Sequence, residues 1–256
     1  MTTPATYAVP QTFLGIARHE PSAPICIAGI PLDLGTTNRS GARFAPAAIR
    51  QASRMLIDGA HPQSLVDPAT LPLLRALKVR RGPPALVHFD AHVDTWPENF
   101  GQAYAHGSVF YHAIGEGLVQ PRRMVQIGIR SPLPREVHDW TLAQGVSIIS
   151  AQEVHEAGAA AVAQRIREIV GEVEVYLSFD IDALDPAFAP GTGTPEVGGL
   201  ASWQAQAILR RLEGLRFVGM DVVEVAPAYD VAEITALAAA TMAWEYLCML
   251  ARERAA

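Results

Sequence analysis

Two short acidic motifs, each placed directly after an apolar run, constrain this chain more than any other feature of its sequence. The first spans residues 88–94 and contains Asp90, His92 and Asp94, and the second spans residues 178–186 and contains Asp180 and Asp182. Because side chains alternate between the two faces of an extended strand, the ligands of the first motif are expected to converge on one point. The same spacing predicts that the two aspartates of the second motif converge on another.

A set of four carboxylates and one imidazole needs a cation to hold it together, because these groups would otherwise repel and desolvate one another. Carboxylate-rich ligation with some imidazole suits Mn²⁺ or a similar divalent ion better than a metal that prefers thiolates. Two such ions bridged by carboxylates would form a hydrolytic site. The motifs therefore predict a metal centre with the ligands Asp90, His92, Asp94, Asp180 and Asp182.

The composition is that of one ordinary globular domain, which we expect to span residues 1–256. Half of the residues are hydrophobic and 18% are charged, as in many α/β proteins. The net charge of −6 gives no electrostatic footprint for nucleic acid, and it is compatible with a small cationic substrate.

The first residues of the chain contain no apolar segment typical of a secretory signal, and the apolar runs are too short to cross a bilayer. Cys26 and Cys248 lack metal-ligand spacing and lie in apolar runs, so both are predicted to be core residues. We therefore expect a soluble cytoplasmic protein with no membrane partner.

Apolar runs and helical segments alternate along the chain. Buried strands are predicted at residues 25–30, 85–89, 124–129, 146–149, 173–179 and 217–223, and helices at about 46–56, 73–80, 108–116, 134–143, 151–170, 202–212 and 231–252. Such alternation predicts a mainly parallel sheet covered on both faces, with the chemistry outside the carboxyl ends of the strands. One stretch departs from it, because no strand separates the first two helices.

At this point the chain resembles the ureohydrolases, the family of arginase and agmatinase, and agmatinase-like members most closely. The motifs that carry the resemblance are residues 90–94, 106–108, 178–186, 193–199 and 221–227. The resemblance implies a three-layer α/β/α fold, a binuclear Mn²⁺ centre and hydrolysis of a guanidinium compound to urea and an amine. It also implies a homo-oligomer, either a trimer or a hexamer.

The family pattern implies a role for each ligand. Asp90 and Asp180 would bridge the two metals, His92 and Asp182 would complete one of them, and Asp94 would help to hold the other. A hydroxide bridging the metals would attack the guanidinium carbon, because metal coordination lowers the pKa of water.

Three further roles follow from the same resemblance. His106 would shuttle a proton to the leaving amine, and Glu224 would pair with the guanidinium of the substrate. Thr194 would lie beside Glu224 in the substrate pocket. Asp94, His106 and Glu224 are thus the predicted catalytic residues, and Thr194 and Glu224 the predicted substrate-binding residues.

The chain departs from the family in one respect. The family has a further histidine ligand in a Gly-Gly-Asp-His motif that ends a strand before Asp90, and this motif is absent from the sequence. A strand, a helix and another strand are predicted to be missing before Leu73, which explains the broken alternation. His61 is a poor replacement because no spacing supports it. The metal held by Asp94 would then have no imidazole ligand.

The nature of the substrate is left open by the sequence. Agmatine, which would give putrescine and urea, is the first candidate, and guanidinobutyrate and guanidinopropionate are close alternatives. These differ in a distal ammonium or carboxylate, and Arg39, Arg43 or Arg130 could receive the carboxylate.

Two other classes of function remain. A catalytically impaired metal-binding relative would hold at most one tight ion and release no urea, because the histidine motif is missing. A Zn²⁺ deacetylase-like hydrolase would need one metal held by Asp180, His92 and either Asp90 or Asp182, and would release acetate.

Three polar residues near the motifs are predicted to be structural. His88 lies on the same strand face as Asp90 but deeper, which favours a hydrogen-bonded core histidine. Asp185 precedes a proline and is predicted to be a turn residue. Asp221 lies within a predicted strand and is expected to orient its neighbours.

Overall fold

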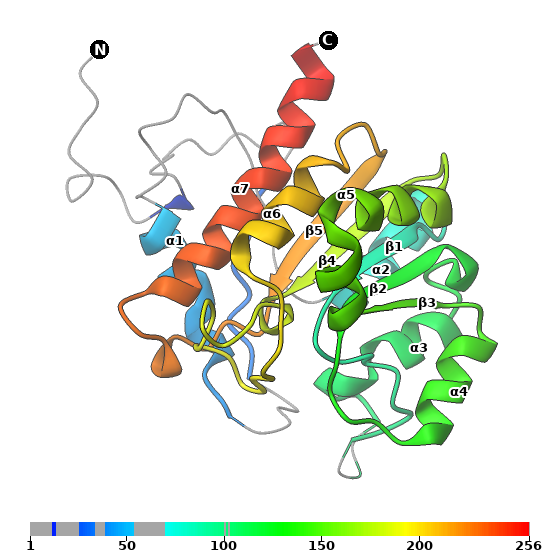
Figure 1. Cartoon of the computed structure of the whole chain (residues 1–256), viewed down its shortest axis with the longest axis horizontal. Coiled ribbons are helices and arrows are strands. Elements are labelled where there is room, and N and C mark those ends of the chain that lie inside the picture. Colours follow the sequence, from blue (N-terminus) through cyan, green and yellow to red (C-terminus); the bar gives the residue numbers. More distant parts are fainter. Residues whose placement is uncertain are drawn as a thin grey trace.

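The computed structural model describes residues 12–13, 26–33, 39–53, 70–99, 101 and 103–255. A five-stranded parallel sheet lies at its centre with helices on both sides (Figure 1). The strand order is β3-β2-β1-β4-β5. The strands are β1 (Ala85–Phe89), β2 (Met124–Ile129), β3 (Ser147–Ser150), β4 (Val175–Asp180) and β5 (Phe217–Val223). The predicted three-layer α/β/α fold is confirmed.

The helices lie close to their predicted positions. They are α1 (Ala45–Ala52), α2 (Thr70–Arg81), α3 (Val109–Gly115), α4 (Arg135–Ala143), α5 (Ala151–Val170), α6 (Ser202–Arg210) and α7 (Ile234–Ala255). The start of α5 shows how local contacts determine where a helix begins. The Ser150 hydroxyl accepts a hydrogen bond from the backbone N–H of Glu153 at 3.1 Å. The Glu153 carboxylate accepts one from Ser150 N at 2.8 Å, which completes a capping box.

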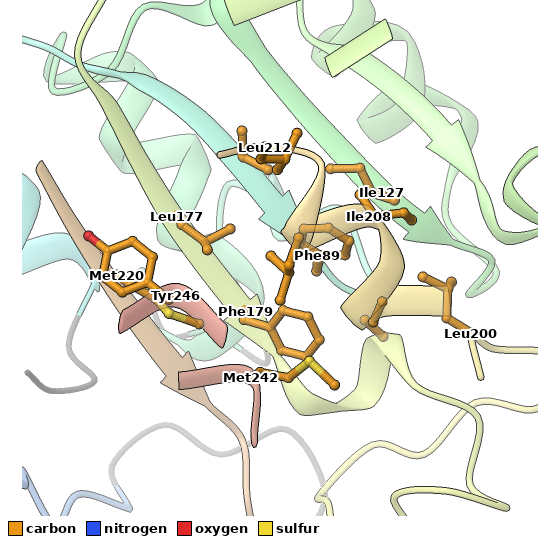
Figure 2. Packing of buried hydrophobic residues seen from close by; sticks show 14 of the residues in the cluster. Phe89, Ile127, Leu177, Phe179, Leu200, Ile208, Leu212, Met220, Met242 and Tyr246 are labelled. Carbon is orange, nitrogen blue, oxygen red and sulfur yellow. The ribbon is translucent and has the colours of Figure 1, made fainter. Parts of the chain in front are cut away.

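The two faces of the sheet bury different helices because alternate strand residues point in opposite directions. One face contributes Phe89, Ile127, Leu177 and Phe179 to a core shared with α5, α6 and α7 (Figure 2). The other face contributes Leu86, Met124 and Tyr176 to a core shared with α2 and α3. Both faces are therefore covered, as a parallel sheet requires.

The strand predicted at residues 25–30 does not form where the structure describes it. Residues 26–33 have no regular structure, and Cys26, predicted to be a core residue, is exposed. A strand is stabilised by backbone hydrogen bonds to a neighbour, and no described residue pairs with this segment. Among the described strands, β5 pairs only with β4 and so lies at the edge of the sheet.

Helix α7 contains one window, Ile234–Ala251, that is long and apolar enough to cross a membrane by composition alone. Half of that window is buried inside the protein. The helix packs against α1, α6 and β5, so its apolar character also fits a core helix.

Candidate metal centre and active site

The candidate site lies at the carboxyl ends of three adjacent strands. Asp90 directly follows β1, Asp180 is the last residue of β4, and Glu224 directly follows β5. The register pairs Phe89 with Phe179 and Asp180 with Val223, so the three strands end at the same edge of the sheet. This is the edge at which parallel α/β sheets bind ligands.

Tight turns, rather than extended strands, bring the ligands together. Asp90 Oδ1 accepts a hydrogen bond from the backbone N–H of His92 at 2.7 Å, and Asp180 Oδ1 accepts one from that of Asp182 at 2.8 Å. Asp94 has a left-handed backbone with φ 49°. The prediction that each motif converges through strand alternation was therefore wrong, because both segments leave the strand conformation directly after the first aspartate. Short side-chain-to-backbone hydrogen bonds then fold them into turns.

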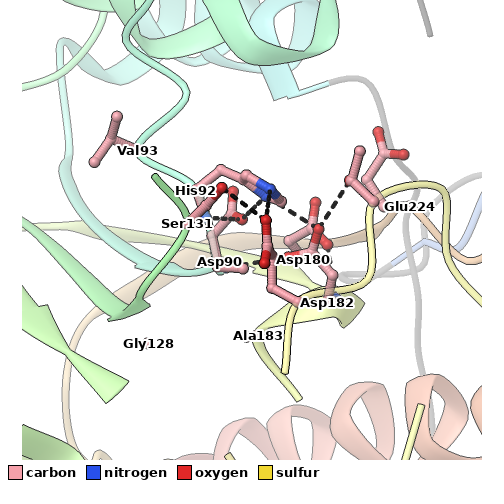
Figure 3. Close-up of polar contacts among 12 residues, drawn as sticks. Asp90, His92, Val93, Gly128, Ser131, Asp180, Asp182, Ala183 and Glu224 are labelled. Atoms are coloured by element: carbon pink, nitrogen blue, oxygen red, sulfur yellow. Dashed lines mark hydrogen bonds and ion pairs between the residues drawn. The ribbon is translucent and has the colours of Figure 1, made fainter. Parts of the chain in front are cut away.

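One cluster combines residues of both motifs. Asp90, His92 and Asp182 each offer a ligand atom, and these three atoms lie within 4.8 Å of one another. His92 Nδ1 lies 3.2 Å from Asp90 Oδ1 and 3.2 Å from Asp182 Oδ2, and the Thr194 hydroxyl donates to Asp182 Oδ2 at 3.2 Å. Figure 3 shows these side chains gathered together with Asp180, and Glu224 beside them.

Two residues of the cluster, His92 and Asp182, line an open cavity of about 550 Å³. The predicted metal ligand Asp180 and the predicted catalytic and substrate-binding residues line the same cavity: Asp94, His106, Thr194 and Glu224. His106 Nδ1 forms a short hydrogen bond with Glu224 Oε1. Glu224 also has a left-handed backbone, with φ 62°, which is uncommon for a residue with a side chain.

Burial and mutual repulsion perturb the acids of the cluster. Burial and the neighbouring charge of Asp182 raise the pKa of Asp90, and burial with the charge of Asp90 raises the pKa of Asp94. Burial likewise raises the pKa of Asp180. Burial acts to raise the pKa of Asp182 as well, but its contact with His92 outweighs this and lowers it. Three carboxyl groups therefore bind protons unusually tightly when no cation is near.

The residues present fit a divalent cation. Asp90 is 1% exposed, and its Oδ2 accepts no well-aligned hydrogen bond from the described residues, although His88 Nε2 lies 2.9 Å away. A buried carboxylate oxygen without such a partner is costly unless a cation approaches it. The donor set of carboxylates and one imidazole is one that hard-to-borderline divalent metals prefer.

The three residues predicted to be structural lie in hydrogen-bonded or buried positions. Asp185 accepts hydrogen bonds from the backbone N–H groups of Ala187, Gly198 and Gly199 and closes the turn after the second motif. Asp221 is fully buried and accepts hydroxyl hydrogen bonds, at 2.6–2.8 Å, from Thr70, Tyr176 and Ser178. His88 is 1% exposed.

Sequence reasoning missed several residues of the cavity wall. Glu196 Oε1 lies 3.9 Å from His92 Nε2 and accepts a hydrogen bond from the Ser131 hydroxyl at 2.9 Å. Trp96 and Asn99 line the same cavity. The position of Glu196, two residues after Thr194, was the only signal in the sequence. His61, which the sequence made a poor candidate for the missing histidine ligand, lies outside the described residues.

The three arginines predicted as possible carboxylate receptors have different surroundings. Arg130 donates to backbone carbonyl oxygens, among them those of Asp182 at 2.8 Å and Glu196 at 2.6 Å. Arg43 forms an ion pair with Asp33. Arg39 lines the cavity, and none of the described carboxylates forms an ion pair with it. Its guanidinium carbon lies 5.0 Å from the centre of the Tyr229 ring.

Comparisons with known proteins identify close relatives of this chain. A family model described as the arginase family matches residues 23–68 and 66–249. An agmatinase of Cronobacter sakazakii is 41% identical over 290 residues, covering 94% of this chain and 92% of its own. An agmatinase of Chromobacterium violaceum is 38% identical, covering 98% of this chain and 92% of its own.

Solved structures give the same result. The crystal structure of a hypothetical agmatinase from Burkholderia thailandensis matches with a TM-score of 0.88 and 39% identity, covering 98% of this chain and 94% of its own. Proclavaminate amidino hydrolase from Streptomyces clavuligerus matches with a TM-score of 0.89 and 38% identity, covering 97% of this chain and 99% of its own.

The alignments also locate the missing segment. The Cronobacter alignment spans 290 positions, more than the 256 residues of this chain, so the relative has residues that this chain lacks. The match to the family model is interrupted at residues 66–68. The strand, helix and strand predicted to be missing from the sequence would lie at this point, directly before α2.

Proposed function

This chain belongs to the arginase family and is a ureohydrolase that acts on the C–N bonds of linear amidines, and from that premise we propose that its substrate is agmatine, with putrescine and urea as products. The agmatinase names of relatives about 40% identical support this choice. We further propose that the metal is Mn²⁺ and that two ions take part.

The observation that carries the proposal is a single cavity in which a carboxylate–imidazole cluster faces a proton-transfer group and an acidic side chain. Asp90, His92 and Asp182 provide the cluster, while His106 and Glu224 are hydrogen-bonded to each other. A ureohydrolase needs these elements, because it must supply a nucleophile, hold a guanidinium cation and protonate an amine.

Each residue of the candidate site has a part in the proposed reaction. Asp90 and Asp180 would be shared by both ions, His92 and Asp182 would complete the set that holds one ion, and Asp94 would help to hold the second. The ions, when bound, supply a water of lowered pKa as nucleophile. Glu224 would bind the guanidinium through charge-assisted hydrogen bonds and hold its carbon towards the cluster. His106, already oriented by Glu224, would carry a proton to the leaving amine.

A guanidino acid is the second candidate substrate, and Arg39 is the observation that favours it. Among the arginines considered for this role, only Arg39 lines the cavity, so it could receive a distal carboxylate. Replacement of Arg39 by Ala should then raise KM for guanidinobutyrate about tenfold or more and leave KM for agmatine unchanged or lower. Arg135→Ala, an exposed arginine on α4, is the control. An unchanged KM for guanidinobutyrate would exclude this role for Arg39.

The proposed substrate is tested by urea release from a panel of agmatine, guanidinobutyrate, guanidinopropionate and arginine, with the protein loaded with Mn²⁺. Agmatine is expected to give the highest kcat/KM. Preference for a guanidino acid would replace agmatine as the substrate and leave the reaction class intact. The absence of urea from a folded protein would favour the impaired metal-binding relative.

We also propose that this single domain works as a homo-oligomer in the cytoplasm. Light scattering coupled to size-exclusion chromatography tests the first part, because a trimer or hexamer would have three or six times the 27.5 kDa mass of the chain. A monomer at working concentrations would contradict it.

A further inference from the structure

A buried chain of polar side chains runs from β2 to the metal ligand Asp90. Gln126 lies on β2 and is 0% exposed, and His88 lies on β1 and is 1% exposed. Gln126 Nε2 lies 2.6 Å from the carbonyl oxygen of Val93 and 3.2 Å from His88 Nδ1. The other ring nitrogen, His88 Nε2, lies 2.9 Å from Asp90 Oδ2. Neither glutamine nor histidine was assigned a part in catalysis above.

The carbonyl oxygen of Val93 determines which atom donates in each hydrogen bond of this row of side chains. A backbone carbonyl can only accept, so the atom of Gln126 that faces Val93 O must be the amide nitrogen. The same nitrogen carries a second hydrogen, which points to His88 Nδ1 and requires that atom to be an acceptor. A neutral imidazole with an unprotonated Nδ1 carries its proton on Nε2. This Nε2 lies 2.9 Å from Asp90 Oδ2.

The opposite tautomer would be unfavourable at this position. It would bring a lone pair of Nε2 to within 2.9 Å of a carboxylate oxygen, and it would bring two N–H donors against each other at Nδ1. The ring of Phe110 lies against His88 with ring centres 4.3 Å apart, which restricts rotation of the imidazole. All three polar side chains are buried, so bulk water does not reach these contacts.

We propose that Gln126 and His88 are positioning residues that fix the Asp90 carboxylate for metal binding. The backbone N–H of His92 donates to Asp90 Oδ1 at 2.7 Å, and His88 Nε2 lies 2.9 Å from Asp90 Oδ2 in a contact that is not aligned as a hydrogen bond. A nitrogen thus lies beside each carboxylate oxygen and limits its rotation. A ligand held this way loses less freedom when the ion binds, and groups that hold metal ligands typically contribute about 10–100-fold to affinity. The inference rests on the metal centre of the proposed function.

The first test is the tautomer itself, in metal-free protein labelled with ¹⁵N-histidine. Two-bond ¹⁵N–¹H spectra should show His88, identified by its absence in a His88→Gln variant, with the proton on Nε2. In Gln126→Glu the donor to Nδ1 becomes an acceptor, and the proton should move to Nδ1. A wild-type His88 with its proton on Nδ1 would overturn the proposal without reference to any activity.

The second test is Mn²⁺ affinity by titration calorimetry. Gln126→Glu and His88→Leu should weaken binding about 10–100-fold, whereas His88→Gln, which keeps an N–H donor at the position of Nε2, should weaken it less than tenfold. Wild-type affinity in folded His88→Leu would overturn the proposal. If that variant does not fold, the tautomer of the wild-type protein still decides. Loss of urea release with normal Mn²⁺ affinity would count against the proposed catalytic function and not against the positioning role of Gln126 and His88.

The chain provides a matched control. Gln204 on α6 has its Nε2 3.3 Å from His155 Nδ1, so it forms a second glutamine–histidine pair. His155 Nε2 faces the carbonyl oxygen of Gly198 at 3.2 Å rather than a metal ligand. Gln204→Glu makes the same chemical change as Gln126→Glu and should leave Mn²⁺ affinity at the wild-type value. An equal loss of affinity in both variants would show that the effect is not specific to Asp90.

Discussion

At the scale of single residues, the two acids that flank the cavity have unusual backbones. Asp94 and Glu224 both adopt left-handed conformations, with φ 49° and 62°. Non-glycine residues in such conformations cost of order 1–3 kcal/mol each and persist where the surrounding structure holds them. Both residues line the cavity that contains the metal cluster. This strain supports their assignment to function rather than to packing.

Glu224 provides the most specific prediction at this scale. Glu224→Gln keeps the size of the side chain and removes the charge that is proposed to bind the guanidinium, so kcat/KM should fall about 10–100-fold, as loss of a charge-assisted hydrogen bond implies. Steady-state kinetics of urea release measure this change in kcat/KM. Glu136→Gln, an exposed change on α4, is the control. An unchanged kcat/KM in Glu224→Gln would remove Glu224 from the site.

The sequence predicted the identity of the site residues better than their contacts. The two-residue spacing selected Asp90, His92 and Asp182, and the structure brings them together. It assigned Glu224 the guanidinium of the substrate as its partner, and the structure pairs it with His106, a residue more than a hundred positions away. Spacing selects candidate ligands within one motif, whereas such pairs depend on where distant loops meet.

At the scale of the elements, the ends of β1 and β4 concentrate buried acids, and this makes metal-free stability depend on pH. Burial raises the pKa of Asp90 from 3.8 to about 8, and those of Asp94 and Asp180 also rise. The folded chain therefore binds protons that the unfolded chain has released. Stability from these groups is full below about pH 4 and is lost as pH rises towards 8. The raised pKa of His92 acts in the same direction above 6.5.

Thermal unfolding checks this prediction. Above pH 6.5, where the lowered pKa of His88 no longer opposes the effect, chelator-treated protein should show a Tm that falls as the pH rises to 8. Saturating Mn²⁺ should remove most of the fall, because the ion takes the place of the protons. A Tm of the metal-free protein that rises over the same range would contradict the assignment of these carboxyl groups as buried ligands without a cation.

Helix α2 depends on a polar contact with the edge strand. The buried Thr70 hydroxyl donates to Asp221 on β5 at 2.6 Å. Thr70→Val should lower the free energy of unfolding by about 1–2 kcal/mol, since Asp221 loses one of its buried donors. Denaturant unfolding measures this. Thr241→Val, which removes a hydroxyl that donates to the backbone carbonyl of Leu237, should have a smaller effect. Equal losses would contradict the role of the Thr70 contact.

The prediction of helices and strands succeeded where the local sequence determines the element, and it failed where a strand depends on pairing with another strand. Strand β1 and helix α5 have the predicted bounds, because an apolar run and a capping box are local. Residues 25–30 are equally apolar, but no described residue pairs with the 26–33 segment. The broken alternation before Leu73 predicted that part of the sheet was missing, and the interrupted family match at residues 66–68 agrees.

At the scale of the whole molecule, the candidate metal ligands lie at the ends of two adjacent strands of the sheet. Asp90, His92 and Asp182 follow β1 and β4, which pair directly with each other. The segment that the relatives have and this chain lacks would contribute a ligand to the other ion, by resemblance to the family. We therefore expect one ion to be held more tightly than the second, and activity to require a high Mn²⁺ concentration.

The most direct measurement of the central claim is product identification by ¹³C NMR, with agmatine labelled at the guanidinium carbon and the protein saturated with Mn²⁺. The account predicts that the label moves to urea while putrescine appears in equal amount. Asp182→Asn and chelator should each abolish the conversion, because both remove the metal cluster. Labelled agmatine that stays intact with folded, Mn²⁺-loaded protein would contradict the account.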